Sequence, residues 1–285
     1  MNHTFKLGTL TCTSLSDFQR DRTPRVTFPK IDPVELQKEI ELGGYDMEID
    51  QPMSLHGNNL LIDTGTQKIL IDSGLPTAGG GELVNSLKEF GLAPEDIDIV
   101  FVTHGDGDHI GGLNNYTQAQ IMMPTQSHQL WTEDTAGMVE EFAKLFRGEI
   151  SDEELEAMKG GRAKYADVLE SIKDRIILID EGQSIIPGMT VIHAPGHRRD
   201  HVAVEIRSGD DILLHVADAW RHPIQLKRRD FYSLFDSYPD ILADTMVKLL
   251  DRAAETEALV FGAHFNFPAL IKIEKDDSGY HWIDI

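Results

Sequence analysis

The chain has 285 residues, of which 41% are hydrophobic and 26% charged, and its formal net charge of −22 argues against nucleic acid as a substrate or partner. It contains no apolar run near the roughly 18 residues that a membrane span needs, and its N-terminus lacks the basic start and apolar stretch of a signal peptide, so we expect neither a membrane segment nor export. The single cysteine, Cys12, cannot form an internal disulfide, which fits a cytoplasmic protein, and the acidic composition favours a small-molecule substrate.

The first half of the chain predicts a hairpin, a helix and two strands, in that order. Two short β-rich runs at residues 60–65 and 69–74 are separated by a Gly-containing turn, which is typical of a hairpin. Three glycines then lead into a helix that Gly91 ends. The apolar run 97–102 predicts a buried strand, and residues 119–123 predict another.

A helical insertion is predicted at about residues 132–173. Its apolar face carries Phe142, Leu145 and Phe146, and we expect these side chains to pack in the core. If the insertion covers a site, they would instead line the entrance through which substrate reaches it. Strands are then predicted at residues 175–180, 189–193, 201–207 and 211–216, followed by a helix at residues 241–250. Three more strands are predicted at residues 258–261, 270–274 and 280–283.

Clusters of strands with helices between them occur in two similar halves. This pattern predicts an α+β fold in which two sheets pack face to face with helices outside. No Pro- or Ser-rich linker divides the chain, so we expect one domain over residues 1–285, with the insertion as part of it.

The most informative stretch, residues 103–112, directly follows the strand at 97–102. Its six residues 104–109 form a glycine-containing loop that carries His104, Asp106, Asp108 and His109. Such charges at the edge of a core are costly unless something positive neutralises them. A divalent metal would do so, and zinc, manganese and iron accept this mixture of nitrogen and oxygen donors. The stretch therefore predicts a metal site.

Three further segments carry histidine or aspartate just past a predicted strand. They are residues 194–201, 213–220 and 260–265, and loops at one end of a sheet sandwich can converge on one point.

In their order and spacing, these motifs resemble the metallo-β-lactamase superfamily of hydrolases, from about Leu55 to Phe267. The resemblance implies a four-layer αββα sandwich and two metal ions about 3.5 Å apart. The implied ligands are His104, Asp106 and His201 for the first metal, Asp108, His109 and His264 for the second, and Asp218 as a bridge between both. The resemblance also implies that Asp72 supports the ligands from behind.

Several other histidines are left open. His197 is an alternative to His201 as ligand and otherwise has a structural role. His215 lies inside a predicted strand and is expected in the core. His222 could face substrate or belong to a turn, and His56 precedes a predicted Gly-Asn-Asn turn.

Asp106 departs from the family pattern, because most members have histidine at that position. A third carboxylate leaves less residual positive charge, so the pKa of a metal-bound water would be lowered less. The extra oxygen donor also shifts preference from zinc toward manganese or iron. Zinc remains the first expectation for the two divalent ions.

The implied function is a dinuclear metal-dependent hydrolase in which a metal-bridging hydroxide attacks and Asp108 carries the proton. Residues 218–223 and 262–268 look like the lactonase and methyl-parathion-hydrolase-like subgroup, which favours a small ester or lactone as substrate.

Two other functions are weighed against hydrolysis. Asp106 favours a non-haem iron or di-iron redox enzyme on the same fold. A non-catalytic scaffold is disfavoured, because all seven ligand positions hold metal-capable residues. The hydrophobic end of the chain, residues 280–285, could pair across a homodimer or simply end a sheet.

Overall fold

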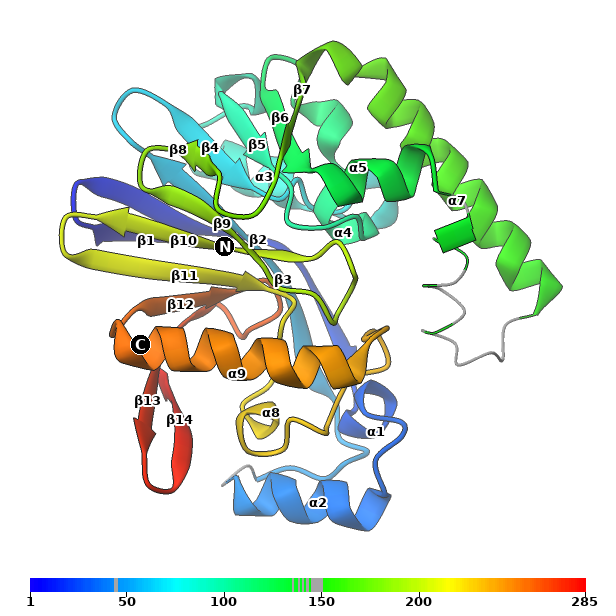
Figure 1. The fold of residues 1–285 in the computed structure, drawn as a ribbon, viewed down its shortest axis with the longest axis vertical. Coiled ribbons are helices and arrows are strands. Elements are labelled where there is room, and N and C mark those ends of the chain that lie inside the picture. Colours follow the sequence, from blue (N-terminus) through cyan, green and yellow to red (C-terminus); the bar gives the residue numbers. More distant parts are fainter. Residues whose placement is uncertain (44–45, 135, 138, 140, 142–143, 145–150) are drawn as a thin grey trace.

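Two seven-stranded sheets lie face to face at the centre of the fold (Figure 1). The computed structural model describes residues 1–43, 46–134, 136–137, 139, 141, 144 and 151–285. The first sheet has its strands in chain order: β1 (Asn2–Leu7), β2 (Leu10–Arg22), β3 (Met53–Asp63), β4 (Lys68–Ile71), β5 (Ile99–Phe101), β6 (Gln120–Pro124) and β7 (Ile176–Ile179). The second sheet runs in the order β14 to β8: β14 (Gly279–Asp284), β13 (Leu270–Asp276), β12 (Leu259–Gly262), β11 (Asp211–Ala217), β10 (Val202–Ser208), β9 (Met189–His193) and β8 (Ser184–Ile186).

Alternation of side chains along the strands fills two apolar layers at once. In β3, Leu60 and Ile62 belong to the core between the sheets, whereas Leu61 joins a second cluster with the helices. In β4, Ile71 and Leu70 divide in the same way. Successive side chains of a strand point to opposite faces, so a continuous apolar run marks a strand that is covered on both sides.

Helices cover the outer faces of both sheets. Leu87 of α3 and Trp131 of α5 pack in the cluster outside the first sheet, and Leu249 of α9 packs with strands of the second (Figure 1). The helices are α1 (Pro24–Thr27), α2 (Pro33–Leu42), α3 (Leu83–Glu89), α4 (Gly107–Ile110), α5 (Thr125–Thr132), α7 (Asp152–Ser171), α8 (Ile224–Lys227) and α9 (Pro239–Glu255). The predicted α+β sandwich with four αββα layers is therefore confirmed.

The predicted elements from residue 60 onward appear close to their expected bounds, and two differences lie before that residue. The expected turn after His56 is wrong, because Gly57, Asn58 and Asn59 lie inside β3. A Cβ on Gly57 would lie 2.3 Å from the Phe18 ring, and the Asn58 amide donates to the carbonyls of Ala263 and Phe265, so both residues suit a buried strand. Elements β1, β2, α1 and α2 were not predicted.

Part of the predicted insertion is also described. It consists of the end of α5 together with α7, whereas Phe142, Leu145 and Phe146 lie outside the described residues. Within the described part of the chain, every helix is too short or too polar to cross a bilayer.

Strand direction brings the candidate loops to one end of the sandwich. In the first sheet, β5 runs parallel to β4 and β6, and in the second, β11 runs parallel to β12. The loops that leave the carboxyl ends of β5, β11 and β12 carry the candidate ligands, as does the loop between β9 and β10.

Candidate metal centre

The first group of convergent side chains consists of His104, His197 and Asp218. One ligand atom of each lies within 4.8 Å of the others, and all three residues are buried. His104 follows β5, His197 lies between β9 and β10, and Asp218 directly follows β11. The group therefore joins loops from both sheets.

The second group consists of Asp108, His109 and His264, with ligand atoms within the same 4.8 Å limit. Oδ1 of Asp108 lies 3.7 Å from Nε2 of His109, and its Oδ2 lies 3.4 Å from Nε2 of His264. Asp108 and His109 belong to the short helix α4, and His264 follows β12.

Asp218 lies between the two groups. Its Oδ1 is 3.3 Å from Nε2 of His109, and its Oδ2 is 2.9 Å from Nε2 of His264 and 3.4 Å from Nε2 of His197. The carboxylate of Asp218 thus faces histidines of both groups, which is the position that a shared ligand requires.

The four histidines of the two groups share one orientation: Nδ1 is held by the protein and Nε2 faces the centre. The Nδ1 partners are Thr103 Oγ1 for His104 (3.1 Å), Asp72 Oδ2 for His109 (2.7 Å), Asp236 Oδ1 for His197 (3.0 Å) and the His56 carbonyl for His264 (2.7 Å). A hydrogen bond at one ring nitrogen fixes the ring and the tautomer that the other nitrogen presents to a metal. Asp72 thus has the supporting position that the sequence predicts.

Buried atoms without hydrogen-bond partners mark the same place. Among the described side chains, Nε2 of His104, Nε2 of His109 and Oδ1 of Asp218 are buried and unpartnered. Burying such atoms unpaired costs on the order of 1–3 kcal/mol each. A cation would supply the missing interaction, and a mixed set of imidazole and carboxylate donors suits a zinc-like divalent ion. The residues therefore fit a divalent metal ion.

Protonation equilibria within the groups show how negative the centre is without a cation. Burial opposes a charged imidazolium at His109, yet the neighbouring Asp72, Asp108 and Asp218 raise its pKa well above the usual value. Burial likewise opposes the charged form of Asp218, but His264 and His109 hold its pKa well below the usual value. Protons on these histidines occupy the place that a metal would take, since metal binding displaces them.

His201, expected as a ligand of the first metal, is not brought to either group. Its Nδ1 donates to the Ala194 carbonyl (2.7 Å), and its Nε2 accepts from the Asp218 backbone N–H (3.0 Å). Burial, followed by the charge of His197, lowers the pKa of His201 to about 3, so the ring stays neutral. With both nitrogens occupied by backbone, His201 has no lone pair for a metal, and His197 takes the expected place.

Asp106 borders the first group but is already paired. Its Oδ1 and Oδ2 accept from Nε and Nη2 of the buried Arg198 at 2.8 and 2.7 Å, and its Oδ2 lies 3.2 Å from Nε2 of His197. Burial opposes ionisation of Asp106, but the Arg198 charge holds its pKa well below the usual value. The positive charge beside Asp106 therefore comes from Arg198, whereas the expected set of ligands placed a metal ion there.

The remaining histidines lie away from the two groups. His215 is buried in β11 and stacks on Phe261, and burial lowers its pKa to about 4, as suits a neutral core residue. His56 and His222 line a second cavity of about 440 Å³, which borders the centre through His264.

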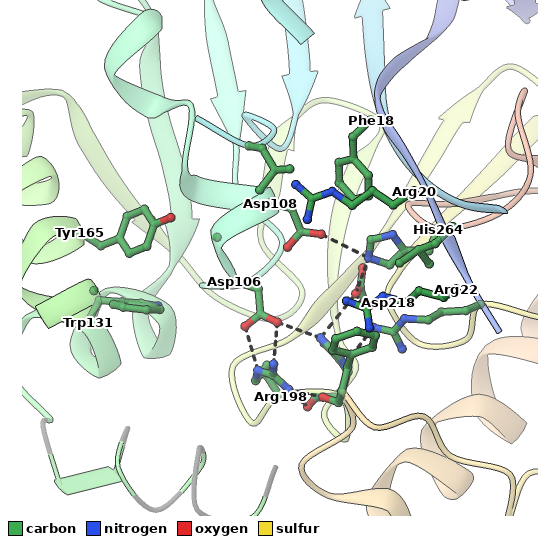
Figure 2. Close-up of a pocket in the computed structure, with 17 residues that line it drawn as sticks. Phe18, Arg20, Arg22, Asp106, Asp108, Trp131, Tyr165, Arg198, Asp218 and His264 are labelled. Atoms are coloured by element: carbon green, nitrogen blue, oxygen red, sulfur yellow. Dashed lines mark hydrogen bonds and ion pairs between the residues drawn. The ribbon is translucent and has the colours of Figure 1, made fainter. Parts of the chain in front are cut away.

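A cavity of about 390 Å³ opens over the centre (Figure 2). Asp106, Asp108, Asp218 and His264 form part of its wall; the other lining residues are Phe18, Arg20, Arg22, Leu55, Leu75, Gly107, Trp131, Gly161, Tyr165, His197, Arg198, Arg221 and Phe235.

Most of these wall residues could not be placed at a site from the sequence. Phe18, Arg20 and Arg22 alternate along β2, and this period of two is the pattern that could have placed them on one face. Trp131 and Tyr165 come from α5 and α7 and meet edge to face, with ring centroids 5.2 Å apart. Burial, followed by the charges of Asp108 and Asp106, raises the pKa of Tyr165, so its hydroxyl remains a neutral donor.

Comparison with known proteins gives a family match over most of the chain. The model of the metallo-beta-lactamase superfamily matches residues 54–264. The Metallo-beta-lactamase domain-containing protein 1 of Xenopus laevis is 31% identical over 90 residues, which are 32% of this chain and 37% of that protein. The Beta-lactamase-like protein 2 homolog of Caenorhabditis elegans is 27% identical over 173 residues, or 57% of this chain and 46% of that protein. The matches thus span between a third and a half of these curated relatives.

Two solved structures share the fold over the whole chain. The dizinc quorum-quenching lactonase AidC, in complex with a product, superposes with a TM-score of 0.86 at 23% identity and covers 100% of this chain and 97% of its own. The hydrolase AbOPH superposes with a TM-score of 0.85 at 21% identity, with the same coverage.

Proposed function

The chain belongs to the metallo-β-lactamase superfamily, and from that premise we propose that it is a metal-dependent hydrolase that holds two divalent cations and cleaves a small ester or lactone. His104, His197 and Asp218 would hold one cation. Asp108, His109 and His264 would hold the other, with Asp218 shared between them. The observation that carries the proposal is the convergence of unpartnered, buried Nε2 atoms on Asp218.

The chemistry divides between the cations and the chain. Cations bound there would supply an activated water and stabilise the oxyanion that forms when a carbonyl is attacked. Asp108 is the candidate proton carrier, because its side chain lines the cavity and is 25% exposed. A carboxylate oxygen of Asp108 would accept the proton of the attacking water and return it to the leaving alcohol. Tyr165, a neutral donor on the opposite wall, would hydrogen bond an oxygen of the ester.

The lactonase similarity supports the ester or lactone class. AidC, a lactonase by its description, shares the fold with this chain, and the cavity over the centre has a volume that suits a small substrate. Asp106 was the residue that favoured the redox alternative, as an added oxygen donor. Its pairing with Arg198 weakens that argument, because both carboxylate oxygens are already engaged.

The test combines metal analysis with turnover. Protein purified without added metal should contain zinc or manganese, remain colourless and cleave 4-nitrophenyl acetate or a γ-lactone in a chelator-sensitive reaction. Iron, colour and iron-dependent oxygen uptake would instead establish the redox alternative.

A substitution at Asp108 tests the assigned proton carrier. Asp108→Asn keeps the shape of the side chain and removes its basicity, so turnover should fall by about 100-fold or more in fully metallated protein. Asp244→Asn, at an exposed position of α9, is the matched control and should leave turnover unchanged. Native turnover in a metallated Asp108→Asn protein would refute the role.

A further inference from the structure

Four arginines line the cavity over the metal centre, and they fall into two pairs. Arg198 and Arg221 are buried and neutralised: Arg198 binds Asp106, and Arg221 donates to Oδ2 of Asp218 (2.7 Å) and Oδ1 of Asp236 (3.2 Å). Arg20 and Arg22, on β2, make no ion pair with any carboxylate of the described residues. Two guanidiniums at the cavity wall therefore keep their charge uncompensated.

Aromatic rings hold the uncompensated guanidiniums in place. The Cζ atom of Arg20 lies 5.1 Å from the centroid of the Phe18 ring, and one Nη2 bond to the Gly79 carbonyl (3.0 Å) anchors it further. The Cζ atom of Arg22 lies 5.1 Å from the centroid of the Phe235 ring. A guanidinium that packs on a ring leaves its N–H edge free, and this planar edge matches a carboxylate or phosphate.

The two side chains face the reacting centre from one side. Figure 2 shows Arg20 and Arg22 near Asp108 and His264, across the cavity from Trp131 and Tyr165. Phe18, Arg20 and Arg22 share this face because they alternate along one strand. A substrate whose ester reaches Asp108 can therefore extend toward both guanidiniums.

Arginine is concentrated in the lining of the cavity, although the chain as a whole is acidic. The cavity wall carries four arginines against three carboxylates, Asp106, Asp108 and Asp218, before any cation is added, whereas the chain as a whole has a net charge of −22. Cations bound at the two groups would add to the charge of the unpaired Arg20 and Arg22, and a positive cleft in an acidic surface concentrates anions. A neutral ester would gain nothing from this arrangement.

We propose that Arg20 and Arg22 bind an oxyanion carried by the substrate, which makes the substrate an ester or lactone with a separate carboxylate or phosphate group. The proposal rests on the proposed function in that the same cavity holds the reacting ester. It adds which substrates are preferred and which residues select them.

The test compares two esters that differ in one charge: mono-4-nitrophenyl glutarate and 4-nitrophenyl butyrate. Arg22→Gln should lower kcat/KM for the glutarate ester by roughly tenfold, mainly through KM, as expected for a lost hydrogen bond to a charged group. The butyrate ester should change less than about twofold. Arg20→Gln should act in the same direction, and Arg22→Lys should retain part of the effect because it keeps the charge without the planar edge.

Arg25→Gln is the matched control. Arg25 lies three residues beyond Arg22, but it is exposed and paired with Asp50, so neither ester should be affected. An equal loss for both esters in Arg22→Gln would overturn the proposal, because it would indicate a structural role.

A binding measurement keeps the proposal testable if neither ester is cleaved. Titration calorimetry with glutarate and with phenyl phosphate should show roughly tenfold weaker binding to Arg22→Gln than to the native chain, and the tighter of the two identifies the preferred oxyanion. Equal affinity for native and variant protein would overturn the proposal, whatever the outcome for hydrolysis.

Discussion

At the scale of single residues, the metal centre depends on which nitrogen of each imidazole is free. His197 and His201 lie on the same loop, and both rings are buried. Asp236 holds Nδ1 of His197 and leaves Nε2 toward Asp218, whereas backbone groups occupy both nitrogens of His201. The partners of the ring therefore decide which histidine can bind a metal.

Alanine at each of these two positions should separate binding from structure. His197→Ala should lose one metal ion per chain or weaken its binding by at least about 100-fold, because a direct ligand is removed. His201→Ala should retain both ions but lower the free energy of unfolding by about 1–3 kcal/mol, because two buried backbone groups lose their partner. Elemental analysis with chelator competition measures the first effect, and urea denaturation the second. The reverse pattern would restore His201 as the ligand.

Sequence patterns could not make this distinction. The spacing of the Gly-His-Arg-Arg-Asp-His run, residues 196–201, allows either histidine, and nothing in it shows that Ala194 and Asp218 supply backbone partners for the later one. The pairing of Asp106 with Arg198 is equally hidden, because the two residues lie 92 positions apart. By contrast, His104, Asp108 and His109 could be predicted, since they share one short loop after a buried strand.

At the scale of elements, the loop that carries His197 is fixed by its contact with α9. Gly196 has a φ of +139°, and a Cβ there would lie 2.4 Å from the Cα of Leu242. The backbone N–H of Tyr238 donates to the Gly196 carbonyl (2.8 Å), and that of Ser237 to the His197 carbonyl (3.1 Å). The position of the ligand thus depends on how closely the loop meets the start of the helix.

Gly196→Ala should disturb both stability and metal binding. The clash with helix backbone, added to the unfavourable φ, should cost about 2 kcal/mol or more and displace His197. Gly209→Ala is the control, because Gly209 also has positive φ (+65°) but no atom within 4 Å of a Cβ. Urea denaturation and metal titration of both variants measure the difference. Equal losses in the two would show that the contact with α9 contributes nothing.

The predictability of each element followed its hydrophobic pattern. Strands such as β5 and β11 are covered on both faces, so their apolar runs were evident. The first 52 residues gave no such pattern, because β2 carries polar residues with specific partners. Asp17, for example, accepts from the backbone N–H groups of Leu75, Glu82 and Leu83. Such pairings join distant segments and leave no periodic trace.

At the scale of the whole molecule, each metal group draws on both sheets. His104, Asp108 and His109 follow a strand of the first sheet, whereas His197, Asp218 and His264 follow strands of the second. Bound cations would therefore join the two sheets at one end of the sandwich.

Metal removal should consequently destabilise the entire fold. A ligand that binds only the folded state at 100 times its Kd adds about 2.7 kcal/mol, so chelation should lower Tm by several degrees. Differential scanning calorimetry with and without chelator measures this change. Asp218→Asn, which weakens the shared ligand, should reduce the response to chelator. Superimposable transitions in the native protein with and without chelator would contradict the assignment of the cluster as a metal centre.

The division of the cavity between two sets of elements has an evolutionary consequence. The reacting centre lies within residues 54–264, which match the family, whereas Arg20 and Arg22 belong to a strand that precedes this region. With the role proposed for Arg20 and Arg22, changes in this one strand would alter substrate preference while the residues of the candidate metal centre stay unchanged. Related enzymes could then come to prefer different substrates without passing through an inactive intermediate.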